Sequence, residues 1–217
     1  MFAIFAKRGV TIALLLAIVA GFVGLSIASF TNQELIDYSA ENKLIESLSA
    51  AFLIFAAVFG AAMAFSKYQG QGWSYFAFLM AMGAVREMDG HKAWTTMSIF
   101  KSRFYVSPEV PFYEKVIGFI VITALLYCIY QVAKKLKAGL CDFWQGRGYA
   151  ISLFTGLGFF AVAKTLDAFF RLFPWLQGGS LEEYTTYMRY SEESLEMFGA
   201  FLMLMVPVLF MRQRRKR

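Results

Sequence analysis

The chain has 217 residues, of which 59% are hydrophobic and 18% aromatic, and its mean hydropathy is +0.54. Soluble domains contain roughly 45–50% apolar residues, so the composition indicates an integral membrane protein and leaves no long polar region for a separate soluble domain. Much of the net charge of +6 flanks apolar segments, as the positive-inside rule expects. We therefore expect membrane orientation, and not a nucleic-acid partner, to explain the basic residues.

Six apolar segments approach or exceed the length needed to cross a hydrocarbon core of about 30 Å. We predict an all-α polytopic membrane protein with a single domain, residues 1–217. The first segment follows Lys7 and Arg8 like a signal peptide, but its apolar run exceeds the 7–15 residues of a signal h-region, which favours a retained helix. The predicted transmembrane helices cover residues 9–30, 44–65, 73–91, 116–133, 149–170 and 193–211.

The charges of the connections predict the orientation. Basic residues gather before the first span, at Lys67, in the connection 134–147 and in the tail 212–217, whereas residues 31–40 and 172–190 contain four acids and one base. Both termini should therefore be cytoplasmic, as in a bacterial cytoplasmic membrane. The exception is the connection 92–115, which is basic and rich in aromatic residues; it suits either an interfacial helix or a loop in the headgroup zone.

Four predicted spans carry polar or ionisable residues at a similar depth below the extracytoplasmic surface. Such residues are costly in lipid and usually face the protein interior, a partner or a pathway. Because the first and fourth spans have no charge in their apolar cores, we expect them to be peripheral to a four-helix site. The polar residues are Asn42 and Glu46; Arg86, Glu87, Asp89, His91 and Lys92; Lys164, Asp167 and Arg171; and Glu192, Glu193 and Glu196.

Some of these acids fit ordinary helix starts. Ser39 and Ser191 are predicted N-caps, which would put Glu41, Glu192 and Glu193 in first turns, where a carboxylate complements the helix dipole. The deeper Glu46 and Glu196 are then the informative acids.

The balance of charge distinguishes a structural network from a functional site. Lys164, Asp167 and Arg171 share one helix face and could neutralise one another. Over the whole cluster, however, with Glu41 and Lys43 included, eight acids face five bases. An uncompensated carboxylate in a low dielectric takes up a proton or binds a cation, so the excess favours a functional site unless solvent reaches the first-turn acids.

An enzyme, either a hydrolase or a transferase acting on a lipid or lipid-linked substrate, is the function that we expect. Buried carboxylates and one imidazole can serve as general acids and bases, and amide or cationic groups can bind the substrate. The predicted catalytic residues are Glu46, Glu87, Asp89, His91 and Glu196, and the predicted substrate-binding residues are Asn42, Arg86, Lys92, Lys164 and Arg171. A divalent metal ion would be held by Glu87, Asp89, His91 and Asp167, although the chain has no HExxH motif and one histidine.

Two other functions fit the same residues. Proton- or cation-coupled transport is the first, although transporter sites usually lie near the midplane between repeated halves, which here would need a homodimer. The second is an assembly subunit of a membrane complex, whose charges form a salt-bridge network and whose Gly156, Gly158 and Gly199 allow close helix approach. The expected partners are membrane lipids and, for either alternative, a second protein chain.

Overall fold

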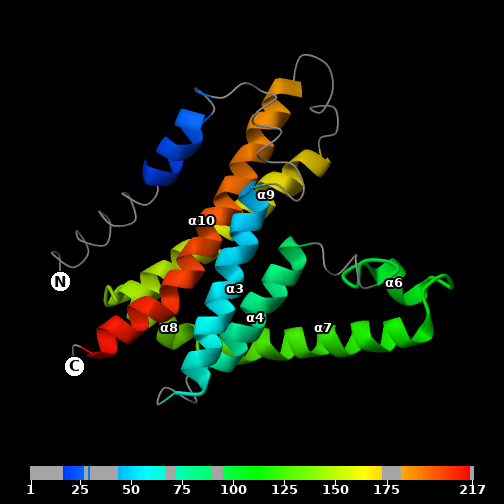
Figure 1. Cartoon of the computed structure of the whole chain (residues 1–217), viewed down its shortest axis with the longest axis horizontal. Coiled ribbons are helices and arrows are strands. Elements are labelled where there is room, and N and C mark those ends of the chain that lie inside the picture. The colour runs from blue at the N-terminus through cyan, green and yellow to red at the C-terminus, as the bar shows by residue number, and fades with distance from the viewer. Residues whose placement is uncertain are drawn as a thin grey trace.

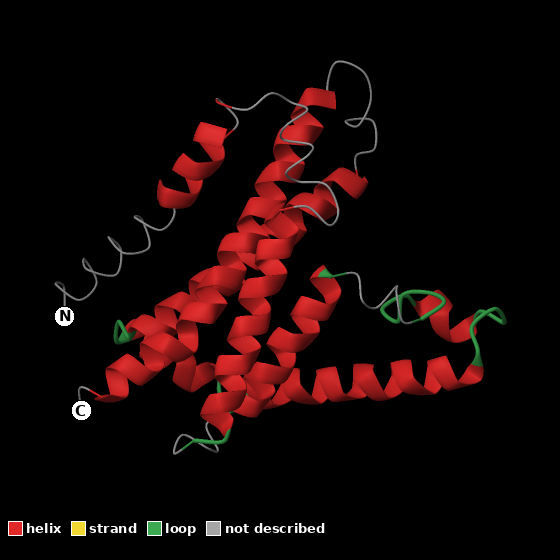
Figure 2. Ribbon diagram, viewed as in Figure 1, coloured by secondary structure: helices red, strands yellow, loops and turns green. Residues whose placement is uncertain are grey.

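The computed structural model describes residues 17–26, 29, 44–66, 72–88, 95–172 and 182–215, and for residues 170, 171, 182–186 and 215 it describes the backbone alone. Within these residues the chain forms helices joined by turns and no strand (Figure 2). The helices are Ala17–Ser26, α3 (Leu44–Ala64), α4 (Trp73–Glu87), α6 (Ser102–Val106), α7 (Phe112–Ala133), α8 (Leu136–Trp144), α9 (Gly148–Leu172) and α10 (Glu182–Arg215).

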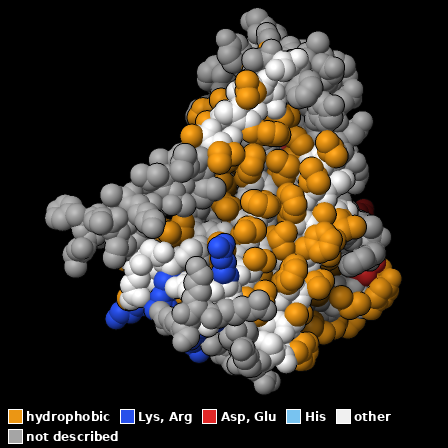
Figure 3. Space-filling model, turned by 60° about the vertical axis from the view of Figure 1, so that its left-hand side comes forward, with side chains coloured by type: hydrophobic (Ala, Val, Ile, Leu, Met, Phe, Trp, Pro, Cys, Tyr) orange, Lys and Arg blue, Asp and Glu red, His pale blue; other side chains and the backbone are white. Residues whose placement is uncertain are grey.

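Four helices are long and apolar enough to cross a membrane: Leu44–Ala64, Phe112–Ala133, Gly148–Phe169 and Tyr187–Arg214. Large apolar side chains cover much of their outer surface, with Phe55 at 55% and Phe119 at 67% exposure. On the face in Figure 3, hydrophobic side chains form a broad area, and Lys and Arg gather at its lower end. Four of the six predicted spans are therefore helices of spanning length, which identifies the chain as a multi-pass membrane protein.

The other two predicted spans are described only in part. Of the span 9–30, the structure describes the helix Ala17–Ser26 and residue 29. Helix α4 has 15 residues, about 22 Å at 1.5 Å per residue, and its C-cap is Met88, whose N–H donates to the Ala84 carbonyl. Helix α4 therefore ends before residue 91, the predicted end of this span. Residues 89–94 lie outside the described part.

Helices α3, α4, α9 and α10 form the bundle, with α10 packed against both α9 and α3, and α3 against α4 (Figure 1). Two glycines set the contact between α9 and α10: a Cβ on Gly156 would lie 3.2 Å from the Gly199 carbonyl oxygen, and the reverse distance is also 3.2 Å. The Ser152 hydroxyl donates to the Leu202 carbonyl across this contact at 2.7 Å. Gly156 and Gly199 thus permit the close approach predicted for them, whereas a Cβ on Gly158 meets nothing within 4 Å.

Helix α10 is longer than its predicted span because it begins at Glu182 and has 34 residues. Ser191 lies inside this helix, where its hydroxyl donates to the Tyr187 carbonyl at 2.7 Å, one turn earlier. The prediction that Ser191 caps the helix is therefore wrong, and Glu192 and Glu193 are not first-turn residues. A signal for the true start is present in the sequence: Ser180 and Glu183 have the S-x-x-E spacing of a capping box.

Helix α7 is peripheral, as predicted for the fourth span: it packs mainly on α4 and extends away from the bundle (Figure 1). The preceding segment folds onto its start. Phe104 of α6 is fully buried with Ile99 and Val110, and Glu114 of α7 accepts hydrogen bonds from the Thr96 backbone N–H at 2.8 Å and hydroxyl at 3.0 Å. Residues 95–111 thus form a short helix with packed turns, as an interfacial segment would require.

Candidate functional site: an acidic cluster between four helices

The charged residues meet at one end of the bundle. Glu46 lies in the first turn of α3, Arg86 and Glu87 end α4, and Lys164 and Glu196 lie on α9 and α10. These elements bring the residues together because α3 begins, α4 ends and α9 approaches its end at this level of the bundle. Four separate stretches of sequence therefore contribute to one cluster, as predicted.

Glu196 is the centre of this acidic cluster. Its side chain is 4% exposed, and its Oε1 contacts Lys164 Nζ and lies 3.9 Å from a terminal nitrogen of Arg86. The two cations are more open, at 38% exposure for the Lys164 side chain and 46% for that of Arg86. One buried carboxylate thus holds two cations that reach toward the surface from different helices.

Glu192 is a second partner of Lys164. Its Oε1 lies 3.4 Å from Lys164 Nζ, and 15% of its side chain is exposed. The prediction that Lys164 could be neutralised within α9 is thus corrected in part, since Lys164 makes ion pairs with α10. Asp167, one turn further along α9, is half-buried and interacts electrostatically with Glu192.

Glu87 and Glu193 add two more carboxylates. Glu87 is 7% exposed at its side chain and lies 4.0 Å from Arg86, its neighbour in sequence. It also interacts electrostatically with Glu46, Lys164 and Glu196. Glu193 interacts with the carboxylates of Glu46, Glu87 and Glu196, so the acids of α3, α4 and α10 lie within electrostatic range of one another.

Acids outnumber bases in this group. Among the side chains that the structure describes here, six carboxylates accompany two cations, namely Glu46, Glu87, Asp167, Glu192, Glu193 and Glu196 around Arg86 and Lys164. Closely spaced carboxylates in a low dielectric are not all ionised unless a cation joins them. The arrangement can therefore exchange protons, bind a cationic group, or present two cations to an anion.

Glu192 and Glu193 are site residues whose role the sequence prediction missed, because it assigned both to a helix start. The uninterrupted helical pattern from Glu182 onward is the signal for their true position. The Ser49 hydroxyl, about one turn along α3 from Glu46, donates to the Ile45 carbonyl of its own helix at 3.0 Å. It is 1% exposed, so it serves α3 and offers its proton to no neighbouring helix.

The structure does not describe the side chains of five predicted site residues. Within the described residues no three His, Cys, Asp or Glu side chains form a group suited to a metal ion, but the predicted metal set includes Asp89 and His91. The residues that lie outside the described residues or side chains are Asn42, Asp89, His91, Lys92 and Arg171.

Comparison of the chain with protein-family models, with curated proteins and with solved structures found no match. The class of the protein is therefore defined by its own features: a helical multi-pass membrane protein with an acidic cluster at one end of its bundle.

Proposed function

We propose that the chain is a membrane-embedded hydrolase or transferase that acts on a lipid or lipid-linked substrate at the acidic cluster. The observation that carries this proposal is the arrangement of Arg86 and Lys164 around Glu196. A buried carboxylate fixes both cations from behind, while each keeps more than a third of its side chain exposed. Cations positioned in this way can bind an anionic group of the substrate without first being ordered.

The remaining carboxylates supply acid and base groups beside the bound substrate. Glu87 and Glu193 interact with each other and with Glu196, so the cluster can hold one carboxyl protonated next to another that is ionised. The ionised group removes a proton from the attacking water or hydroxyl, and the protonated group gives one to the leaving oxygen. This division of roles suits hydrolysis or group transfer at an ester or phosphoester.

A divalent cation is part of the proposal as a second way to balance the acids. Glu87 would be joined by Asp89 and His91, which follow it in sequence, and by Asp167. Hard cations prefer carboxylate oxygens, whereas an added imidazole favours transition metals. Elemental analysis of the purified protein tests this part, and absence of a stoichiometric metal would remove it.

Transport of protons or cations is the second candidate. The observation in its favour is the mutual proximity of carboxylates from α3, α4 and α10, since membrane carriers use such groups as proton relays. A transporter should produce an ion flux across the membrane of vesicles that contain the protein, whereas a lipid-modifying enzyme should not.

The experiment compares lipid conversion in vesicles made from a total membrane lipid extract, with the lipids followed by mass spectrometry. Wild type should convert at least one lipid species. Glu87→Gln and Glu193→Gln should slow this about 100-fold or more, as loss of a general acid or base does, and Arg86→Gln should raise KM. Glu109→Gln is the matched control, because Glu109 is exposed and lies in the turn after α6.

Thermal stability is measured on the same samples, so that loss of activity is separated from loss of fold. A wild type that converts no lipid but dissipates a pH gradient, with the flux abolished in Glu193→Gln, would replace the enzyme by a transporter. If neither activity is found and the cluster variants lower stability alone, the cluster is a structural network and both functions are wrong.

A further inference from the structure

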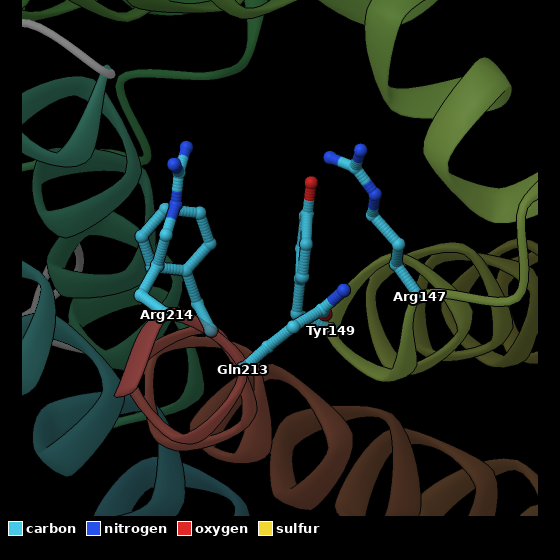
Figure 4. Close-up of a pocket in the computed structure, with 5 residues that line it drawn as sticks. Arg147, Tyr149, Gln213 and Arg214 are labelled. Atoms are coloured by element: carbon cyan, nitrogen blue, oxygen red, sulfur yellow. The ribbon is translucent and has the colours of Figure 1, made fainter. Parts of the chain in front are cut away.

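A hollow lies at the opposite end of the bundle from the acidic cluster, where the start of α9 meets the end of α10 (Figure 4). It is small, with room for about one water molecule. Arg147 and Tyr149 come from the turn after α8 and the first turn of α9, whereas the other residues come from the last turns of α10. The lining residues are Arg147, Tyr149, Phe210, Gln213 and Arg214.

The aromatic ring of Phe210 organises this hollow. Tyr149 meets it edge-on, with ring centroids 5.1 Å apart and an interplanar angle of 76°. The Arg214 guanidinium lies over the same ring, 5.2 Å from its centroid, a favourable contact for a cation. In Figure 4 the ends of Arg147, Tyr149 and Arg214 point toward the same side, so two guanidiniums and a hydroxyl share one opening.

Arg147 is held in place by an acid. One of its terminal nitrogens lies 2.7 Å from Asp142 Oδ1, and the Tyr149 hydroxyl donates to Asp142 Oδ2. Hydrogen bonding with Tyr149 and the charge of Asp142 raise the pKa of Arg147, so the guanidinium stays charged. Because Asp142 engages one face of the guanidinium fork, other N–H groups of Arg147 stay available to a ligand.

Bases greatly outnumber acids at this end of the bundle. Asp142 is the one acidic residue between positions 115 and 166, and the sequence from 197 to 217 has none. The excess positive charge is therefore much larger than Asp142 can neutralise. The described bases of this end are Lys134, Lys135, Lys137, Arg147, Arg212 and Arg214.

We propose that this hollow is a binding site for a phosphate group, with Arg147 and Arg214 as its two cationic arms and Gln213 as a neutral hydrogen-bond donor, while Tyr149, whose hydroxyl proton goes to Asp142, helps to hold Arg147 in place. Guanidinium forks match phosphate oxygens in geometry and charge. The hollow itself has room for about one water molecule, so the phosphate group lies at its mouth, between the two guanidiniums, and is not enclosed. This site is independent of the proposed enzyme activity.

The phosphate has two sources, an anionic phospholipid or a soluble phosphate compound. The hollow lies at the ends of two candidate spans, Gly148–Phe169 and Tyr187–Arg214, which is the level of the lipid headgroups. Basic pockets between transmembrane helices at this level bind anionic headgroups. The position therefore favours the phospholipid.

The test measures binding of phosphatidylglycerol to the purified full-length chain in a neutral detergent, with phosphatidylcholine, whose phosphate is neutralised by its own choline cation, as the zwitterionic comparison. Arg214→Gln and Arg147→Gln should each weaken phosphatidylglycerol binding about ten-fold, the effect of losing one hydrogen bond to a charged group. Lys137→Gln is the matched control, since it removes the same charge from an exposed position of α8 that does not line the hollow. Its affinity should stay within about two-fold of wild type, as expected for a screened surface charge.

The outcomes separate a site from diffuse attraction. Equal weakening by all three variants, or equal binding of the two lipids by wild type, would overturn the proposal. Arg214→Gln keeps the conclusion independent of folding, because Arg214 is exposed and does not contact Asp142. A second measurement uses inorganic phosphate as a competitor. Competition with phosphatidylglycerol at comparable concentration assigns the site to soluble phosphates, whereas failure to compete assigns it to the lipid.

Discussion

Replacing Lys164 should cost more stability than replacing its buried partner Glu196. In a balanced network the order of the two stability losses would be reversed, because replacing the buried carboxylate would leave both cations without their shared partner. The expectation follows from the excess of carboxylates around the pair, and the two substitutions change that excess in opposite directions.

In Lys164→Met, the Glu196 carboxylate loses its closest cation and keeps Arg86, which is 3.9 Å away and half exposed. Leaving a buried charge without its partner costs roughly 3–5 kcal/mol when both groups are fully buried. Since 38% of the Lys164 side chain is exposed and Arg86 remains, we expect a loss of about 2–3 kcal/mol in the free energy of unfolding.

In Glu196→Gln, by contrast, one negative charge leaves a cluster that has too many. Lys164 keeps Glu192 at 3.4 Å, and the repulsion on Glu87 and Glu193 falls. The amide has nearly the same shape as the carboxylate and can still accept a hydrogen bond from Lys164. We expect a loss of about 1 kcal/mol or less, the range of partly exposed ion pairs.

The assay is reversible unfolding of the purified protein in mixed micelles, with Glu109→Gln as the control and the double variant completing a thermodynamic cycle. The cycle measures the coupling between the two residues separately from each single loss. If Glu196→Gln destabilises as much as Lys164→Met or more, the cluster is a balanced salt-bridge network, and the reasoning from acid excess is wrong.

Four further substitutions test the packing. Gly199→Val should lower the free energy of unfolding by about 1–3 kcal/mol because its side chain meets a backbone carbonyl, whereas Gly158→Ala, with open space around it, should not destabilise; thermal unfolding of both checks this, and equal losses would contradict it. Ser152→Ala should cost about 0.6 kcal/mol, typical of a hydrogen bond between membrane helices, measured by the same unfolding; no loss would mean that the bond adds nothing. Glu114→Ala should release the segment from Thr96 and speed its proteolysis several-fold with the bundle intact, and an unchanged cleavage rate would show that Phe104 packing suffices.

Much of the fold could be predicted because long apolar runs in a bilayer have few alternatives to helix. The spans around residues 44–65, 116–133, 149–170 and 193–211 are helices, and the uncharged fourth span is peripheral. Helix ends were harder to predict: a serine before two glutamates is a good cap pattern, yet Ser191 lies inside α10, which already begins at Glu182. That error hid two of the acids that join the cluster.

The site was partly predictable for a related reason. Depth along a helix can be counted from the sequence, so the common level of Glu46, Arg86, Glu87, Lys164 and Glu196 followed from their positions within apolar runs. Which of these residues form ion pairs could not be predicted from the sequence, because partners three or four positions away on the same helix compete with partners on other helices. The hollow beside Arg147 was not predicted at all, since its two arms come from positions 67 residues apart.

The sequence by itself determined that this is a helical membrane protein with charged residues at one level and basic residues at the ends of its helices. The physical reason is that a chain in lipid must satisfy its backbone hydrogen bonds within each helix, so composition and length suffice. Only the tertiary structure decided that Lys164 faces Glu196 and Glu192 on α10, because that choice depends on how closely α9 and α10 approach at Gly156 and Gly199. The same contact holds α9 and α10 side by side. It therefore places residues of both helices in the acidic cluster at one end and in the basic hollow at the other.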